Sequence, residues 1–160
     1  MTKYIENQKF PKWISISFLG LIFFWIYLLI KTYGTSTFIG MLIAGLFTVL
    51  INIFFLIARL ISRIDKDGIT VRFIPFHFKQ IKYNWIDIES CEIRKYNPIF
   101  EFGGWGIRYG FKGKAYNIKG NKGIQLRLKN GRRILIGTQN SVEVERLIRQ
   151  YFTKTDLKYE

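Results

Sequence analysis

Cysteine and histidine are almost absent from this 160-residue sequence, in which Cys91 is the only cysteine and His77 the only histidine. One thiol forms no intramolecular disulfide, so a disulfide-stabilised scaffold is excluded. A zinc or iron–sulfur site built from several Cys and His ligands is excluded for the same reason. Acidic residues are also scarce: 11 Asp and Glu stand against 25 Lys and Arg, a formal net charge of +14.

Apolar residues are plentiful but unevenly distributed. The hydrophobic share is 49% and the aromatic share 18%, which argues against a disordered chain. Nearly every long apolar run precedes Arg63, whereas most of the charge follows it. The length suits about one soluble domain, or less if part of the chain lies in a membrane. The composition therefore predicts a membrane part joined to a separate folded part.

Two uncharged runs predict a pair of membrane-spanning helices. Residues 13–30 form 18 uncharged positions, and residues 38–58 form 21. Eighteen helical residues reach about 27 Å, which is close to the thickness of a bilayer core. Residues 31–37 have room only for a turn, and a helix pairs its own backbone in lipid. Two buried helices of a soluble core are disfavoured, because so small a chain does not cover them.

The charges that flank the two runs predict their orientation. Positive residues lie before the first run and after the second, whereas the turn between the runs has only Lys31. Cytoplasmic segments carry the excess of Lys and Arg, so we expect both termini in the cytoplasm. These flanking residues are Lys3, Lys9 and Lys12, and Arg59, Arg63 and Lys66.

After Arg63 the apolar period changes to two, as in half-buried strands. Asn140 is placed to cap a helix that carries an apolar stripe of Val144, Leu147, Ile148 and Tyr151. The final residues, 153–160, look like a frayed tail. About seven strands are expected, over residues 69–73, 77–82, 88–96, 107–111, 115–118, 124–128 and 132–136.

About seven antiparallel strands closed by a C-terminal helix are the order of a pleckstrin-homology-like (PH-like) fold, which is mainly β within the α+β class. The main alternative fold is an OB-type barrel, but that fold has five strands and does not end with further strands and a closing C-terminal helix. We therefore expect a two-helix transmembrane hairpin plus a PH-like domain. The predicted divisions are an N-terminal cytoplasmic segment at 1–12, a hairpin at 13–62, the PH-like domain at 63–152 and a tail at 153–160.

The glycine- and aromatic-rich part of the chain resembles a known group of sequences. The matching motifs are Trp85-x-Asp87-Ile88, Tyr96-Asn97-Pro98, Gly103-Gly104-Trp105-Gly106-Ile107-Arg108, Gly113-x-Ala115-Tyr116, Gly120-x-x-Gly123 and Gly137-Thr138-Gln139. Over residues 64–150 they resemble uncharacterised bacterial membrane proteins with two spans and a PH-like cytoplasmic domain. The resemblance implies that fold and a bacterial inner-membrane location, and it implies no reaction.

The segment from Gly103 to Arg108 is a candidate site with two interpretations. Its three glycines allow backbone angles that other residues avoid, so the segment is either a β-bulge over a packed Trp105 or a binding loop. In a binding loop, Trp105 supplies contact area and Arg108 a charge for a carboxylate or phosphate.

Basic residues are dense in the last strands, and residues 64–160 carry a net charge of +9. An anionic leaflet attracts such charges at about 1 kcal/mol each, so we expect surface contacts from Arg127, Lys129, Arg132 and Arg133. Specific nucleic-acid binding is disfavoured, because no recognition motif is present.

The loop at residues 73–78 lacks the basic residues with which PH domains bind phosphoinositides. Its Phe76 and Phe78 either enter the membrane interface or belong to the core.

No catalytic set stands out. Asp87 and Glu89 are two carboxylates two residues apart, but no nucleophile and base pair accompanies them, and Cys91 has no histidine nearby in sequence. We expect a non-enzymatic membrane-anchored module, without cofactor or metal, whose partner is the lipid bilayer, another membrane protein or a second copy. A membrane-bound enzyme or an accessory subunit of a transporter is the alternative.

Overall fold

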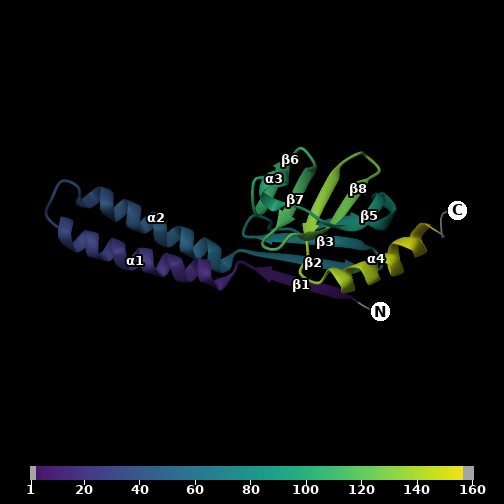
Figure 1. Ribbon diagram of the computed structural model, residues 1–160, viewed down its shortest axis with the longest axis horizontal. Helices are drawn as coiled ribbons and strands as arrows, with labels where there is room; N and C mark the ends of the chain where they lie inside the picture. Colours follow the sequence, from purple (N-terminus) through teal and green to yellow (C-terminus); the bar gives the residue numbers. More distant parts are fainter. Residues whose placement is uncertain (1–2, 157–160) are drawn as a thin grey trace. The chain divides into compact units, whose positions relative to one another are not determined.

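A computed structural model describes residues 3–156 of the chain (Figure 1). The chain forms two compact units: residues 10–58 make the first, and the segments before and after them together make the second. We refer to these as the helical unit and the β unit.

The helical unit is an antiparallel pair, α1 (Lys12–Thr32) and α2 (Phe38–Ile57). Both are long and apolar enough to cross a membrane. The side chain of Trp25 packs against Gly45, and the rings of Phe18 and Phe55 stack with their centroids 5.6 Å apart. No residue of α1 is buried, and in α2 only Gly45 and Asn52 are, so nearly all of the apolar surface faces outward.

The first sheet of the β unit has the order β1-β2-β3-β4. In β2, Leu60, Ser62 and Ile64 are buried and alternate with more exposed residues. At one end of the sheet Lys9 lies opposite Arg59, and Arg59 lies opposite Ile74. The strands are antiparallel and span β1 (Tyr4–Lys9), β2 (Arg59–Asp65), β3 (Gly68–Ile74) and β4 (Ile81–Asn84).

The second sheet has the order β5-β8-β9-β7-β6. Its strands are β5 (Ile88–Lys95), β6 (Gly106–Gly110), β7 (Gly113–Asn117), β8 (Lys122–Leu128) and β9 (Arg133–Gly137). The hairpin of β6 and β7 joins the sheet through β7, which pairs with β9 in parallel. This parallel pair corrects the expectation of a wholly antiparallel arrangement.

Three helices complete the β unit: the 3-10 helix η1 (Trp85–Asp87), α3 (Pro98–Phe102) and α4 (Ser141–Asp156). As predicted, α4 begins after Asn140, whose side chain accepts from the backbone N–H of Glu143. Val144, Leu147 and Ile148 are buried, and α4 packs against β5, η1 and β2. The apolar stripe therefore covers both sheets.

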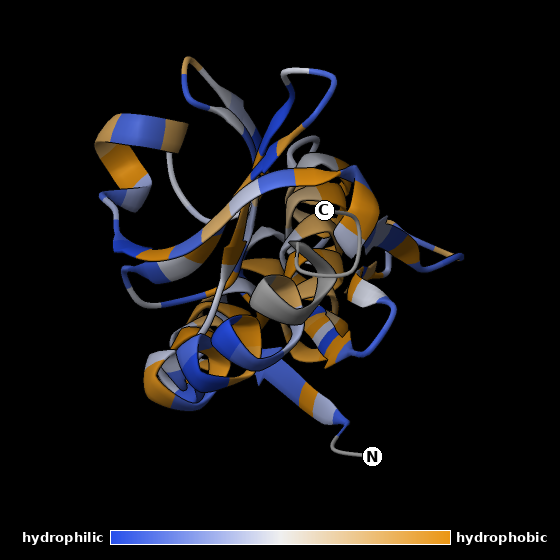
Figure 2. Ribbon diagram, turned by 90° about the vertical axis from the view of Figure 1, so that its right-hand side faces the viewer, coloured by the Kyte–Doolittle hydropathy of each residue, from blue (hydrophilic) through white to orange (hydrophobic). Residues whose placement is uncertain are grey.

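The described residues contain nine strands instead of about seven, because β1 and β2 were not expected. The strand β1 was missed because it is mostly hydrophilic: in Figure 2 the strand nearest the N label is mainly blue, with one orange and one pale band. The strand β2 follows directly on the apolar run of α2, which hides its alternation.

The chain also divides at positions other than those predicted. Residues 4–9, expected in a separate segment, and residues 59–62, expected in the hairpin, belong to the first sheet. The strand expected at 77–82 is β4 at 81–84, because the chain turns after Pro75. In the predicted tail the helix α4 continues to Asp156, and residues 157–160 lie outside the described part.

Candidate functional site

The β6–β7 turn and the β8–β9 turn border an open groove with a volume of about 490 Å³. Tyr109 and Phe111 provide aromatic surface, and the side chain of Phe111 is fully exposed. Lys114, Arg132 and Arg133 provide positive charge. None of the described residues that line the groove is acidic. The groove thus combines three cations with aromatic surface, which suits an anionic group that carries an apolar part.

Lys114 is positioned by two aromatic rings. Its Nζ lies 4.9 Å from the ring centroid of Tyr109 and 4.8 Å from that of Tyr116, so both rings stabilise the ammonium group. Tyr116 itself is buried. Burial, and then the neighbouring Tyr116 hydroxyl group, raise the pKa of Tyr83 well above its usual value. The two hydroxyl groups stay protonated, so neither neutralises Lys114.

The cations of the groove have no acidic partner in the part of the chain that the structure describes. Among the described residues, no ion pair involves Lys114, Arg132 or Arg133. Two basic residues outside the groove do have acidic partners: Lys112 pairs with Glu101, which Arg94 shares, and Arg127 pairs with Glu89. The three cations of the groove differ from these two in lacking a described acidic partner.

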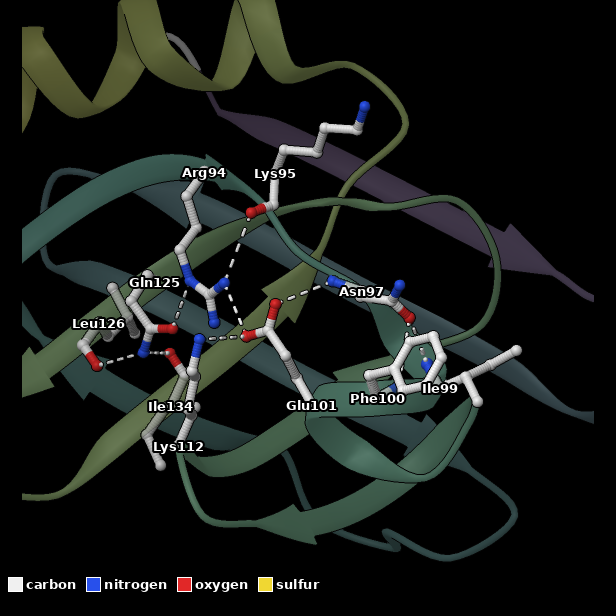
Figure 3. A network of polar contacts seen from close by, with 10 residues as sticks. All are labelled: Arg94, Lys95, Asn97, Ile99, Phe100, Glu101, Lys112, Gln125, Leu126 and Ile134. Carbon is white, nitrogen blue, oxygen red and sulfur yellow. Dashed lines mark hydrogen bonds and ion pairs between the residues drawn. The ribbon is translucent and has the colours of Figure 1, made fainter.

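A polar network around Glu101 fixes the segment that carries β6 and β7 (Figure 3). One carboxylate oxygen of Glu101 lies 2.9 Å from an Arg94 nitrogen and 3.3 Å from Lys112 Nζ, and the other accepts from the Asn97 backbone N–H. Burial favours a raised pKa, but the Asn97 N–H and the two cations outweigh it, so the pKa of Glu101 is lowered. The network joins β5, α3 and the β6–β7 turn.

The predicted loop from Gly103 to Arg108 is internally bonded. Gly103, Gly104 and Gly106 all have positive φ, which favours glycine. Arg108 Nε donates to the Trp105 carbonyl oxygen at 2.9 Å, and its side chain lies beside Gly104 and Gly106. Trp105 is 40% exposed. Neither Trp105 nor Arg108 lines the groove.

Of the four predicted surface contacts, the structure brings Arg132 and Arg133 into the groove. Arg127 lies opposite Arg133 in the β8–β9 ladder but pairs with Glu89, 3.1 Å away. Lys129 is exposed beside the β8–β9 turn and does not line the groove. Sequence reasoning missed Tyr109, Phe111 and Lys114 as a group, because only the parallel β7–β9 pair places them beside Arg132 and Arg133.

The other candidate chemical groups lie apart. Asp87, at the end of η1, accepts from the side-chain amide of Asn84. Glu89, on β5, pairs instead with Arg127 of β8. Burial, together with the charge of Glu92, raises the pKa of the Cys91 thiol to about 12, so the thiol stays protonated at neutral pH. The described residues contain no cluster of three or more His, Cys, Asp or Glu that is able to hold a metal ion.

The aromatic residues of the segment after β3 are exposed. Phe76 is 59% exposed and Phe78 is 90% exposed. The alternative that placed both in the core is therefore wrong, because the chain turns outward between Pro75 and Gln80 instead of continuing as a strand.

Comparison with known proteins gives a family and no function. A search among curated proteins finds no match. A family model described as "Family of unknown function (DUF6141)" matches residues 13–153, which takes in α1, α2 and nearly all of the β unit. The chain belongs to this family of unknown function.

Proposed function

We propose that this protein is a two-span membrane protein that holds a PH-like, non-enzymatic binding domain on the cytoplasmic side of a membrane. The observation that carries the proposal is the pairing of β1 with β2. These strands lie on either side of the helical unit in the sequence, yet they form one continuous antiparallel ladder. Paired strands lie on one side of a membrane, so the segment between them crosses it an even number of times.

The surface of the helical unit supports its place in lipid. The two helices have 21 and 20 residues, and large apolar side chains cover them all round. Phe23 and Ile30 are each 72% exposed, and Phe47 is 63% exposed. An apolar surface of this size needs a cover, and a bilayer core matches the length of the helices.

The strand order supports the PH-like assignment. Two segments interrupt a simpler pattern: the helical unit lies between β1 and β2, and α3 with the β6–β7 hairpin lies between β5 and β8. The remaining strands form a four-stranded antiparallel sheet and the three-stranded antiparallel order β5-β8-β9, followed by a C-terminal helix. This arrangement agrees with the strand order expected of a PH-like fold that carries two insertions, and it therefore supports the proposal.

The groove indicates the class of ligand. Three unpaired cations beside Tyr109 and Phe111 match a phosphate group attached to an apolar body, and the nearest abundant source is an anionic lipid of the same membrane. We infer that the domain binds an anionic lipid headgroup through Lys114, Arg132 and Arg133.

The test is retention of lipid by the full-length protein. The protein is purified in mild detergent and titrated with phosphatidylglycerol or with zwitterionic phosphatidylcholine, and bound lipid is counted by native mass spectrometry. We expect a preference for phosphatidylglycerol that falls about tenfold in the variant Arg132→Gln/Arg133→Gln, as the loss of two charge-assisted contacts implies.

The matched control is Lys66→Gln/Lys95→Gln, which removes the same charge from exposed lysines outside the groove. It should retain the preference. An equal loss in both variants contradicts a site at the groove and leaves only general attraction to the basic domain. The absence of any preference in the wild type contradicts lipid as the ligand.

A further inference from the structure

The β3–β4 loop, residues 75–80, presents two aromatic side chains to the outside. Phe78 is 90% exposed and Phe76 is 59% exposed, and they flank His77. Exposed phenylalanines on a short loop are costly in water, and two of them on one loop indicate a surface that is covered in the functional protein.

The loop is held in this shape by His77. Its backbone N–H donates to the Phe73 carbonyl oxygen at 2.7 Å, and its Nδ1 accepts from the Phe73 N–H at 3.2 Å. Its ring meets that of Tyr116 edge to face, at 5.5 Å between centroids. His77 therefore points toward the second sheet, and both neighbouring aromatic side chains are exposed. Phe76 and Phe78 are therefore held in an exposed position before any partner binds, which lowers the entropic cost of binding through them.

The loop begins at the end of the sheet from which the helical unit is connected. Lys9, Arg59 and Ile74 lie side by side across β1, β2 and β3, and Pro75 directly follows Ile74. Only residues 10–11 separate β1 from α1, and only Ala58 separates α2 from β2. Along the chain, this end of the sheet is therefore separated from the ends of the two helices by one or two residues.

Basic groups accompany the aromatic residues. Lys79 follows Phe78 and is exposed, and Arg72 Nε donates to the His77 carbonyl oxygen at 3.2 Å at the base of the loop. Aromatic side chains that insert below the headgroups, with Lys or Arg beside them, are typical of segments that lie in a membrane interface.

We propose that the β3–β4 loop enters the interface of the bilayer that the helical unit spans, with Phe76 and Phe78 among the upper acyl chains and Lys79 among the headgroups. This proposal rests on the proposed membrane insertion. The loop is a second attachment that fixes the domain against the lipid surface, separate from the groove at Tyr109 and Phe111.

Depth-dependent fluorescence quenching tests the proposal in the full-length protein. In a Cys91→Ser background, single cysteines replace Phe78, Ile86 or Leu46 and carry an environment-sensitive nitrobenzoxadiazole label. Vesicles contain phosphatidylcholine and phosphatidylglycerol, together with a lipid that carries a nitroxide either near the headgroup end of its acyl chain (the upper nitroxide) or near the bilayer centre (the central nitroxide). Ile86 is the matched control, because it is an exposed apolar residue at the other end of the first sheet. Its position follows from Asn84, two residues earlier, which pairs with Gly68 at that end. Leu46 lies in α2 and reports insertion of the hairpin.

We expect the label at Phe78 to be quenched by the upper nitroxide about twofold or more above the label at Ile86, and the label at Leu46 to be quenched best by the central nitroxide. Equal, weak quenching at Phe78 and Ile86 with strong quenching at Leu46 overturns the loop contact and leaves the two-span proposal intact. Weak quenching at Leu46 as well overturns both.

Discussion

Lys9 and Arg59 lie opposite each other at the end of the β1–β2 ladder, and the whole helical unit lies between them in the sequence. The ladder therefore forms only if the chain leaves the β unit and returns to it. The N-terminal strand also contacts the second sheet: Glu6 accepts from the Thr138 hydroxyl group and from the Gln139 N–H, each at 2.7 Å. The residues before α1 are thus an integral part of the domain.

Substitution of Gln8 tests how much β1 contributes to the stability of the β unit. Its side chain is 2% exposed, and its Nε2 donates to the Gly137 carbonyl oxygen at 2.7 Å. Gln8→Ala leaves that buried carbonyl oxygen without its donor, so we expect a loss of about 1–3 kcal/mol in the free energy of unfolding. Denaturant unfolding in detergent micelles measures it. Asn7→Ala, an exposed position on the same strand, should change it by less than about 0.5 kcal/mol; equal effects contradict the role of Gln8.

Glu101→Gln tests the network that holds the β6–β7 segment. The substitution removes the negative charge shared by Arg94 and Lys112, so we expect a loss of about 1–3 kcal/mol in unfolding free energy. Because the folded pKa of Glu101 is lowered, its contribution is present above its usual pKa and is lost as pH falls through the lowered value. Unfolding curves of both proteins at neutral and at acidic pH measure this. A difference that does not shrink at low pH contradicts the ionic origin.

The lowered pKa of His77 predicts that the stability of the domain also depends on pH in a range above that of Glu101. Burial, and then the charge of Lys114, lower the pKa of His77 from 6.5. The unfolded chain therefore takes up a proton first, so the stabilising contribution of neutral His77 is complete above about pH 6.5 and is lost as pH falls toward the lowered value. Protonation removes the Nδ1 acceptor of the Phe73 N–H and places a cation near Lys114 and the Arg72 guanidinium.

We expect the Tm of the wild type to fall as the pH drops below about 6.5, because the unfolded chain takes up the proton before the folded protein does. In His77→Gln this fall should be largely absent, although its Tm at pH 7 is lower. Differential scanning fluorimetry across this range gives both curves. Parallel slopes in the two proteins would contradict the assignment to His77.

Gly113 tests the close approach of β7 to β9. Its φ is +108°, and an added Cβ would collide with the carbonyl oxygen of Arg133. Gly113→Ala should cost about 3 kcal/mol or more in unfolding free energy and disrupt the groove. Gly131→Ala is the control, because Gly131 has a φ of +81° and open space around it, and we expect about 1 kcal/mol. Similar small losses would contradict the packing of the parallel pair.

The sequence predicts the local elements well where one pattern dominates. The uncharged runs predict α1 and α2, alternation predicts the last antiparallel strands, and Asn140 marks the start of α4. The strand β1 escapes detection because it lies at a sheet edge, and its buried side chain is the polar Gln8. Its partner lies beyond the helical unit, and no local pattern records so distant a pairing.

The candidate site is only half predictable for a related reason. Arg132 and Arg133 are visible as part of a basic run, whereas Tyr109 and Lys114 belong to a different hairpin. The parallel pairing of Lys114 with Ile134 brings the two segments together, and such a register depends on tertiary contacts. The sequence likewise cannot show that Arg108 bonds to Trp105, because that bond depends on three positive φ angles.

The most direct test of the two-span proposal is the side of the membrane on which each part lies. Single cysteines at Tyr33, between the two helices, and at Asn130, in the β8–β9 turn, are placed in a Cys91→Ser background and probed in intact cells with a membrane-impermeant maleimide. We predict that Tyr33→Cys is labelled from outside and that Asn130→Cys is labelled only after the membrane is permeabilised. Labelling of Asn130→Cys in intact cells, or equal protection of both positions until permeabilisation, would contradict a two-span protein with a cytoplasmic domain.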